Sequence, residues 1–150
     1  MSAKSEQYAL LRKQVESLTE GESDLTANLA NVAAAIQQIF QFWWTGFYLV
    51  RGEQLVLGPF QGPVACTRIP YGKGVCGTAW ERRETVIVPD VEEFPGHIAC
   101  SSASRSEIVV PLFRAGEVVG VLDIDSRELA TFDEEDAAGL EAIGKLLFQA

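Results

Sequence analysis

The stretch EIVVPLFRAGEVVGVLDID, residues 107–125, constrains the fold more than any other part of the chain. Two runs that are rich in β-branched residues stand on either side of a short turn that contains Gly116. This is the pattern of a β-hairpin, in which two antiparallel strands pair across a tight turn. The chain is therefore expected to contain an antiparallel sheet.

Helical patterns are found before and after this hairpin. Apolar residues recur at helical spacing from Tyr8 to Leu18 and from Leu25 to Phe40, and Ser23 or Asp24 can cap the second helix. A closing helix follows residue 132, with Asp133 as its cap. Between the helices, aromatic and β-branched residues predict further strands at 43–50, at 54–60 and at 85–90, and a loop from Pro63 to Pro70 is expected to lead into another short strand.

These elements predict an α+β domain of two or three layers, with helices at both ends and an antiparallel sheet between them. A length of 150 residues suits one domain with a substantial core. Neither a linker nor an internal repeat divides the sequence, so we expect a single domain over residues 1–150.

Charge and hydropathy argue against two classes of partner. The formal net charge is −9, and the densest basic run is only Arg82 and Arg83, so nucleic acid and anionic membrane surfaces are not expected to bind. The N-terminus lacks the apolar run of a signal peptide, and no run is long enough to cross a bilayer. We therefore expect a cytoplasmic protein, in a compartment that keeps thiols reduced.

Strand alternation places several polar and aromatic side chains on common faces. Asp123 and Asp125 follow Val121 on one face of the last strand, and Glu107 shares a face with Val109 on the strand before it. A half-buried carboxyl group ionises less readily, so one of these acids could hold a proton near neutral pH. The alternative is that the strand frays into solvent at the two aspartates, and the residues alone slightly favour that alternative.

Trp44 and Tyr48 share one face of the first strand. Aromatic side chains in strands most often belong to the core. The other interpretation makes them the wall of a pocket, which requires that they face the same cavity as the acids, and alternation within one strand does not decide this.

Three cysteines, Cys66, Cys76 and Cys100, stand among glycines and serines in stretches that look like loops. Structural zinc usually takes ligands in close pairs, so a site formed by these thiols and His97 is the minority interpretation. Redox chemistry needs an attacking thiolate and a second thiol that can reach it. Small neighbours (Ala99, Ser101 and Ser102) would leave Cys100 accessible. Inert free cysteines are the alternative, and the residues alone leave the two interpretations about even.

The glycine-rich run GKGVCG, residues 72–77, precedes a short predicted helix. It has neither the Walker spacing nor the dinucleotide-binding spacing. Its backbone amides, around Val75, could still bind a carboxylate at the helix N-terminus. A plain turn is the alternative.

Four segments together resemble a known family. IPYGKGVCGTAWERRETVIVPDV, SEIVVPLF, GEVVGVLDIDS and FDEEDAAGLEAI resemble a GAF domain. The cysteine trio and the three acids narrow the resemblance to the free methionine-(R)-sulfoxide reductases, GAF-domain enzymes that reduce the free amino acid. This resemblance implies a central antiparallel sheet with the N- and C-terminal helices on one face. It also implies loops that form a ligand pocket on the other face.

The resemblance implies a catalytic role for each cysteine. Cys100 resembles the family's catalytic thiol, and Cys66 resembles the thiol that resolves it. Cys76 would be a nearby third thiol that could relay or substitute and that also lines the substrate site. Which pair forms the disulfide at rest stays open.

The resemblance also implies the substrate site. Glu107, Asp123 and Asp125 resemble the acids that bind and protonate the substrate, while Trp44 and Tyr48 resemble the wall beside its methyl end. The loop around Val75 is expected to bind the substrate carboxylate.

For partners, the resemblance implies free methionine-(R)-sulfoxide as substrate, no bound cofactor and no metal. Thioredoxin, reduced by NADPH and thioredoxin reductase, would be the external reductant in a defence against oxidative stress. A homodimer that pairs through the first helix is possible. The alternative function is a non-catalytic GAF module that senses a small ligand.

Overall fold

The computed structural model describes residues 2–98, 100 and 103–148. Its centre is a six-stranded antiparallel sheet with the strand order β3-β2-β1-β6-β5-β4. The strands have the following bounds: β1 Trp44–Arg51, β2 Gln54–Gln61, β3 Arg68–Pro70, β4 Val86–Val88, β5 Ser106–Arg114 and β6 Glu117–Ser126. The predicted hairpin is the β5–β6 pair, which lies in the middle of the sheet together with β1.

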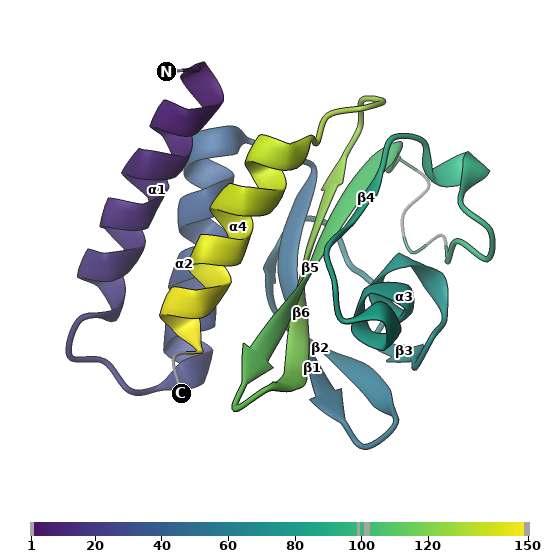
Figure 1. The fold of residues 1–150 in the computed structure, drawn as a ribbon, viewed down its shortest axis with the longest axis horizontal. Helices are drawn as coiled ribbons and strands as arrows, with labels where there is room; N and C mark the ends of the chain where they lie inside the picture. The colour runs from purple at the N-terminus through teal and green to yellow at the C-terminus, as the bar shows by residue number, and fades with distance from the viewer. Residues whose placement is uncertain (1, 99, 101–102, 149–150) are drawn as a thin grey trace.

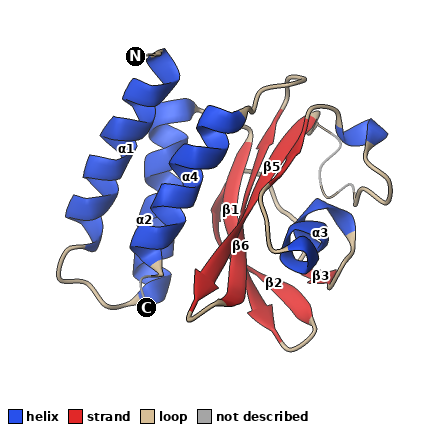
Figure 2. Cartoon of the chain, in the orientation of Figure 1, coloured by secondary structure: helices blue, strands red, loops and turns tan. Residues whose placement is uncertain are grey.

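Helices cover the two faces of the sheet unequally (Figure 1). Three long helices, α1 Ala3–Thr19, α2 Leu25–Phe40 and α4 Glu134–Leu147, lie on one side. The short helix α3 Gly74–Arg82, the 3₁₀ turn η1 Val91–Glu93 and their loops lie on the other side, as the colours of Figure 2 show. The predicted α+β fold, with the terminal helices on one face, is therefore confirmed.

The alternation of side chains along each strand divides the apolar residues into two cores. Phe47 of β1, Ile108 of β5 and Leu122 of β6 face the long helices, where they pack with the buried faces of α1, α2 and α4. Their chain neighbours on the opposite face, among them Val109 and Val121, pack under α3 and the loops instead. Because successive side chains of a strand point to opposite faces, one hairpin supplies both cores.

A buried polar network joins α1 to α4. Asp136 in the first turn of α4 is 1% exposed and accepts a hydrogen bond from the hydroxyl of Tyr8 at 2.6 Å. Its other oxygen pairs with the ammonium of Lys4 at 2.6 Å and accepts the backbone N–H of Asp133, which completes a capping box. The network therefore links α1 to α4 through a hydrogen bond and an ion pair, in addition to their apolar packing.

Among the described residues, no helix combines the length and the apolar composition needed to span a membrane.

We expect Tyr8→Phe to lower the free energy of unfolding by about 1.5–3 kcal/mol, the usual contribution of a hydrogen bond to a charged group. The substitution keeps the ring and removes only the hydroxyl that serves Asp136. The measurement is urea unfolding of both proteins. Arg12→Ala is the matched control on α1, because its ion pair with Glu16 is exposed and should be worth less than about 0.5 kcal/mol. Equal losses in the two variants would contradict the prediction.

Candidate functional site

The register of the central strands sets three carboxyl groups side by side. Asp125 of β6 stands opposite Glu107 of β5 on one side and Trp44 of β1 on the other. Two residues earlier on the same face of β6, Asp123 stands opposite Val109 of β5. Because residues that are paired across antiparallel strands point to the same face, the acids gather on the face that α3 covers.

These acids lie inside the molecule. Asp123 and Glu107 are each only 6% exposed, and Asp125 is partly buried. Strand β6 continues to Ser126 and is paired on both sides, so the expectation that the strand frays into solvent at the two aspartates is wrong. The two neighbouring strands and α3 provide the cover that could not be inferred from β6 alone.

Helix α3 places Cys76 directly over the acids. Gly77 lets this helix come close to β3, because a Cβ at that position would lie 2.6 Å from the carbonyl oxygen of Pro70. Cys76 is 3% exposed and lies in the first turn of α3, so its predicted place in an open loop is also wrong.

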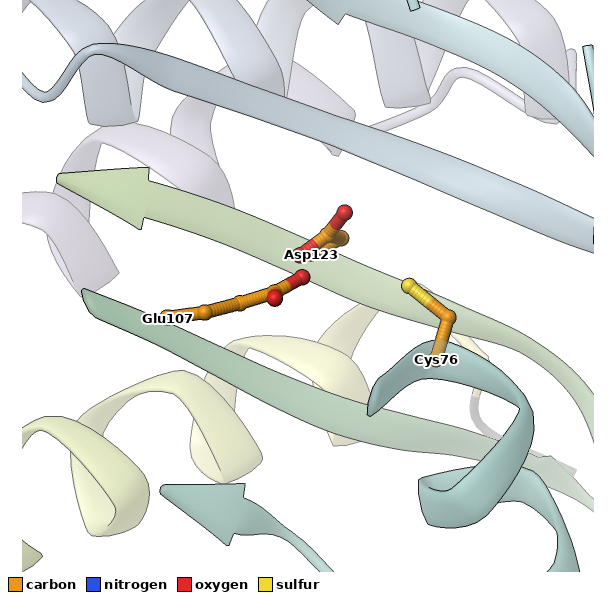
Figure 3. A group of neighbouring side chains, drawn as sticks. All are labelled: Cys76, Glu107 and Asp123. Carbon is orange, nitrogen blue, oxygen red and sulfur yellow. The ribbon is translucent and has the colours of Figure 1, made fainter. Parts of the chain in front are cut away.

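Figure 3 shows Cys76 pointing from α3 toward Glu107 and Asp123 on the sheet. One possible ligand atom from each of these three residues lies within 4.8 Å of the others. The set could therefore offer one thiol and two carboxylates to a cation.

The other two cysteines are joined. Cys66, in the loop after β2, and Cys100, in the segment after η1, form a disulfide with a Cα–Cα distance of 5.3 Å. Their sulfurs are thus not available in this state for the metal site that was considered with His97 and Cys76. The expectation that small neighbours leave Cys100 accessible concerns residues 99, 101 and 102, which lie outside the described residues.

Burial controls the protonation of the acids. Burial, reinforced by the charge of Asp125, raises the pKa of Glu107 to about 8. Burial and the charge of Glu107 raise the pKa of Asp123 well above its ordinary value, and burial and the charge of Asp123 do the same to the pKa of Asp125. The cluster therefore holds protons near neutral pH and can donate them.

Two neighbours of the cluster also change their proton affinity. Burial, and then the nearby charge of Asp123, raises the pKa of the Cys76 thiol, which disfavours its thiolate. His97 lies beside the cluster, with its Nε2 atom 3.7 Å from Oε1 of Glu107. Burial lowers the pKa of His97 although the charge of Asp123 opposes this shift.

One oxygen of the cluster has no hydrogen-bond partner among the described residues. The Oδ1 atom of Asp123 is buried and accepts no hydrogen bond from the described part of the chain. A buried acceptor without a partner is costly, and a ligand that carries donors can satisfy it. This oxygen is therefore the natural place for a cationic or N–H group.

An aromatic wall closes the side of the site formed by β1. Trp44 and Tyr48 are almost fully buried and stack with ring centroids 6.0 Å apart. The Tyr48 hydroxyl donates to the carbonyl of Cys66 at 2.8 Å, and Nε1 of Trp44 donates to the carbonyl of Pro63 at 3.0 Å. Nothing in the spacing of the aromatic residues indicated these two hydrogen bonds.

A cavity of about 40 Å³ lies among these groups. Its lining includes every predicted site residue except Cys66, namely Trp44, Tyr48, Val75, Cys76, Cys100, Glu107, Asp123 and Asp125. Cys66 is bonded to one of them. His97 also lines the cavity and was not predicted as part of the site, because a lone histidine in an irregular segment carries no spacing signal. The fold thus brings the predicted residues together, while their individual roles remain predictions.

The arrangement combines three chemical abilities in one small space. Protonated carboxyl groups can donate protons, and a thiol pair can exchange two electrons by forming or breaking a disulfide. The Oδ1 atom of Asp123, which has no partner among the described residues, can accept a hydrogen bond from a cationic or N–H group. No described lysine or arginine lines the cavity to compete for these acids.

The chain is similar to several known proteins. Residues 22–150 match the sequence model of a family described as GAF domain. GAF domain-containing protein A of Dictyostelium discoideum is 60% identical over 97% of this chain and 92% of its own length. Free methionine-R-sulfoxide reductase of Escherichia coli is 48% identical over 93% of this chain and 86% of its own length. The X-ray structure of free methionine-R-sulfoxide reductase from Neisseria meningitidis in complex with its substrate has a TM-score of 0.95 and 55% identity, and the match covers 98% of this chain and 89% of that one.

Because these acids are buried, we expect the free energy of unfolding to fall as pH rises. Between its ordinary value of 4.5 and its raised value of about 8, Glu107 keeps its proton in the folded chain but loses it in the unfolded chain. The free energy of unfolding should therefore drop by about 1.4 kcal/mol per pH unit for this group. Urea unfolding of the disulfide-bonded protein at pH 5 to 8 measures the slope.

Glu107→Gln cannot ionise, so its slope over the same range should be smaller by about that amount. The remaining slope comes from the other titrating groups, including Asp123, Asp125 and His97, which both proteins share. Parallel pH profiles for the two proteins would show that Glu107 does not retain its proton in the fold.

Proposed function

We propose that this chain, which belongs to the GAF-domain family, is a free methionine-R-sulfoxide reductase that reduces the sulfoxide through Cys100, Cys66 and the buried acids. The observation that carries the proposal is the disulfide itself, which reaches a cavity lined by three carboxyl groups with raised pKa. A module that only binds a ligand needs no such pair of thiols. The alternative function, a non-catalytic module that senses a small ligand, does not explain why the two thiols form a disulfide at the cavity.

The charges of a free amino acid fit the two sides of the cavity. Its ammonium group can donate to Asp123, whose Oδ1 atom has no partner among the described residues. Its carboxylate suits the first amides of α3, near Val75, because a helix N-terminus attracts anions and no side chain caps this one. A methionine within a protein chain has neither charged group, which is consistent with a substrate that is the free amino acid.

The acids supply the proton that the reaction needs. A sulfoxide sulfur becomes a good electrophile once its oxygen is protonated or strongly hydrogen-bonded. With a pKa of about 8, Glu107 is protonated at neutral pH and can act as a general acid. Asp123 and Asp125 complete the acid cluster, and Trp44 and Tyr48 provide the apolar wall for the methyl end of the substrate.

The proposed reduction takes place in two steps at the cysteines. The Cys100 thiol attacks the sulfoxide sulfur, the sulfur–oxygen bond of the substrate breaks, and the oxygen passes to Cys100, which becomes a sulfenic acid as methionine leaves. Methionine has then gained two electrons and Cys100 has lost them. The thiol of Cys66 displaces water from the sulfenic acid, and the disulfide that joins the two residues results. Cys76 keeps its proton because burial raises its pKa, so it is less suited to the attack and serves at most as a relay or substitute thiol.

An external dithiol must reduce the disulfide before the next turnover. We propose thioredoxin, kept reduced by NADPH and thioredoxin reductase, and we therefore propose that the enzyme works in the cytoplasm.

Residues 1–150 would act as one domain. Leu10 and Leu18 of α1 are 50% and 41% exposed, which would suit pairing of two copies through this helix.

The assignment of the thiols predicts different behaviour for two serine variants. In a thioredoxin-coupled assay, the wild type should consume NADPH with free methionine-(R)-sulfoxide, and Cys100→Ser should not. Cys66→Ser should release one equivalent of methionine in a single turnover and then stop, because its sulfenic acid cannot form the disulfide. Methionine-(S)-sulfoxide serves as the control substrate. An inactive wild type would refute the reductase function, whereas activity in Cys100→Ser would move the nucleophile elsewhere.

If Glu107 is the general acid, its replacement should lower kcat. Glu107→Gln keeps the shape but cannot donate a proton, so kcat should fall by about 10²–10⁴-fold. The wild-type rate should also decline as pH rises through about 8, where Glu107 ionises. Steady-state kinetics from pH 6 to 9 measure both effects. A variant with an altered KM and an unchanged kcat would leave Glu107 as a binding residue only.

A further inference from the structure

The segment that carries Cys66 is held from inside the pocket by two aromatic side chains. The hydroxyl of Tyr48 donates to the backbone carbonyl of Cys66 at 2.8 Å. Nε1 of Trp44 donates to the backbone carbonyl of Pro63 at 3.0 Å. Both donors come from β1, in the middle of the sheet, and their side chains are 2% and 3% exposed. A rigid element therefore anchors a loop at two points.

The loop runs directly against the indole ring. Gly62 has a φ of +132°, and a Cβ at this position would lie 2.7 Å from Cδ1 of Trp44. By contrast, the side chain of Val64 is 86% exposed and contributes little apolar burial. Ala65 and Cys66 pack partly against the core on this face, and the two hydrogen bonds add directional contacts that fix where the backbone before Cys66 lies.

We infer that Tyr48 and Trp44 are positioning residues for the resolving cysteine, in addition to their predicted place in the pocket wall. The inference rests on the proposed function, in which Cys66 must reach the sulfenic acid on Cys100. In that step the sulfur–oxygen bond of Cys100 breaks, the sulfur–sulfur bond forms, and the oxygen leaves as water with the thiol proton of Cys66. Tyr48 and Trp44 exchange no atoms; they keep the thiol of Cys66 near its target.

The inference can be measured through the equilibrium between the Cys66–Cys100 disulfide and the two free thiols. The disulfide ties Cys66 to Cys100, and the Tyr48 hydrogen bond ties the same backbone segment to β1, so each should strengthen the other. Removal of the hydroxyl should weaken the disulfide relative to the two thiols. The Tyr48 hydroxyl is a neutral donor at physiological pH, because burial and the charge of Asp123 raise its pKa.

The test is the equilibrium of the Cys66–Cys100 pair with glutathione and glutathione disulfide, read by acid quenching, alkylation and mass spectrometry. Tyr48→Phe keeps the ring and should lower the equilibrium constant for disulfide formation by about three- to tenfold, which corresponds to the loss of one hydrogen bond. Tyr8→Phe is the matched control. It also removes a buried hydroxyl and destabilises the fold, but far from the disulfide, so its equilibrium constant should equal that of the wild type.

A kinetic measurement tests the same inference during turnover. In Tyr48→Phe, the rate of disulfide closure is compared with the variant's own rate of methionine release, because Tyr48 also lines the substrate cavity. Closure of the disulfide should be slower, and capture of the sulfenic acid by dimedone should increase. Trp44→Phe is the second variant, and it should shift the glutathione equilibrium in the same direction by a smaller factor, because Pro63 lies farther along the chain from Cys66.

The outcomes separate this inference from the proposed function. An unchanged glutathione equilibrium in Tyr48→Phe overturns the inference, and a raised KM alongside it would make Tyr48 a wall residue only. An equal shift in Tyr8→Phe also overturns it, since general destabilisation would then explain the effect. A shift confined to the pocket variants supports the inference even if the wild type reduces no sulfoxide, because the equilibrium is measured without substrate.

Discussion

The burial of three carboxyl groups on one face of the central sheet is the constraint on which the rest of the site depends. Ionised carboxylates in such a place would repel one another and would lose their hydration, so the cluster retains protons instead. Retained protons make the cluster an acid at neutral pH, and the unpartnered oxygen of Asp123 makes it a receptor for a donor. A site of this kind destabilises the fold as pH rises.

The two faces of the sheet differ in what they carry: one holds the main apolar core, and the other holds the candidate site. The face toward α1, α2 and α4 carries a continuous apolar core, and Asp136 joins the helices through a fully paired polar network. The opposite face carries the acids, the buried thiol of Cys76 and the disulfide under a short helix and loops. Strand alternation makes this division possible, because one strand such as β6 can give Leu122 to the first face and Asp123 to the second.

Much of this could be predicted from local patterns, and the failures have physical reasons. The alternation in β6 correctly put Asp123 and Asp125 on one face, but the depth of that face depends on β1, β5 and α3, which lie far away in the chain. Cys76 was expected in a loop because glycines surround it. In the fold, Gly77 is needed for the close approach of α3 to β3, so a signal that normally marks a turn here marks tight packing.

Local sequence patterns are enough to predict the strands, the helices and the phase of their side chains, because these follow from interactions between residues close in the chain. The resemblance to a family implied roles for the cysteines and the acids, and these roles are predictions. Only the tertiary structure decided that Cys66 and Cys100, which are 34 residues apart, meet in a disulfide, and that Tyr48 reaches back to hold the backbone of Cys66. Such contacts join segments that are distant in the chain, and their geometry is set by the register of the strands and the packing of the layers, which no local pattern contains.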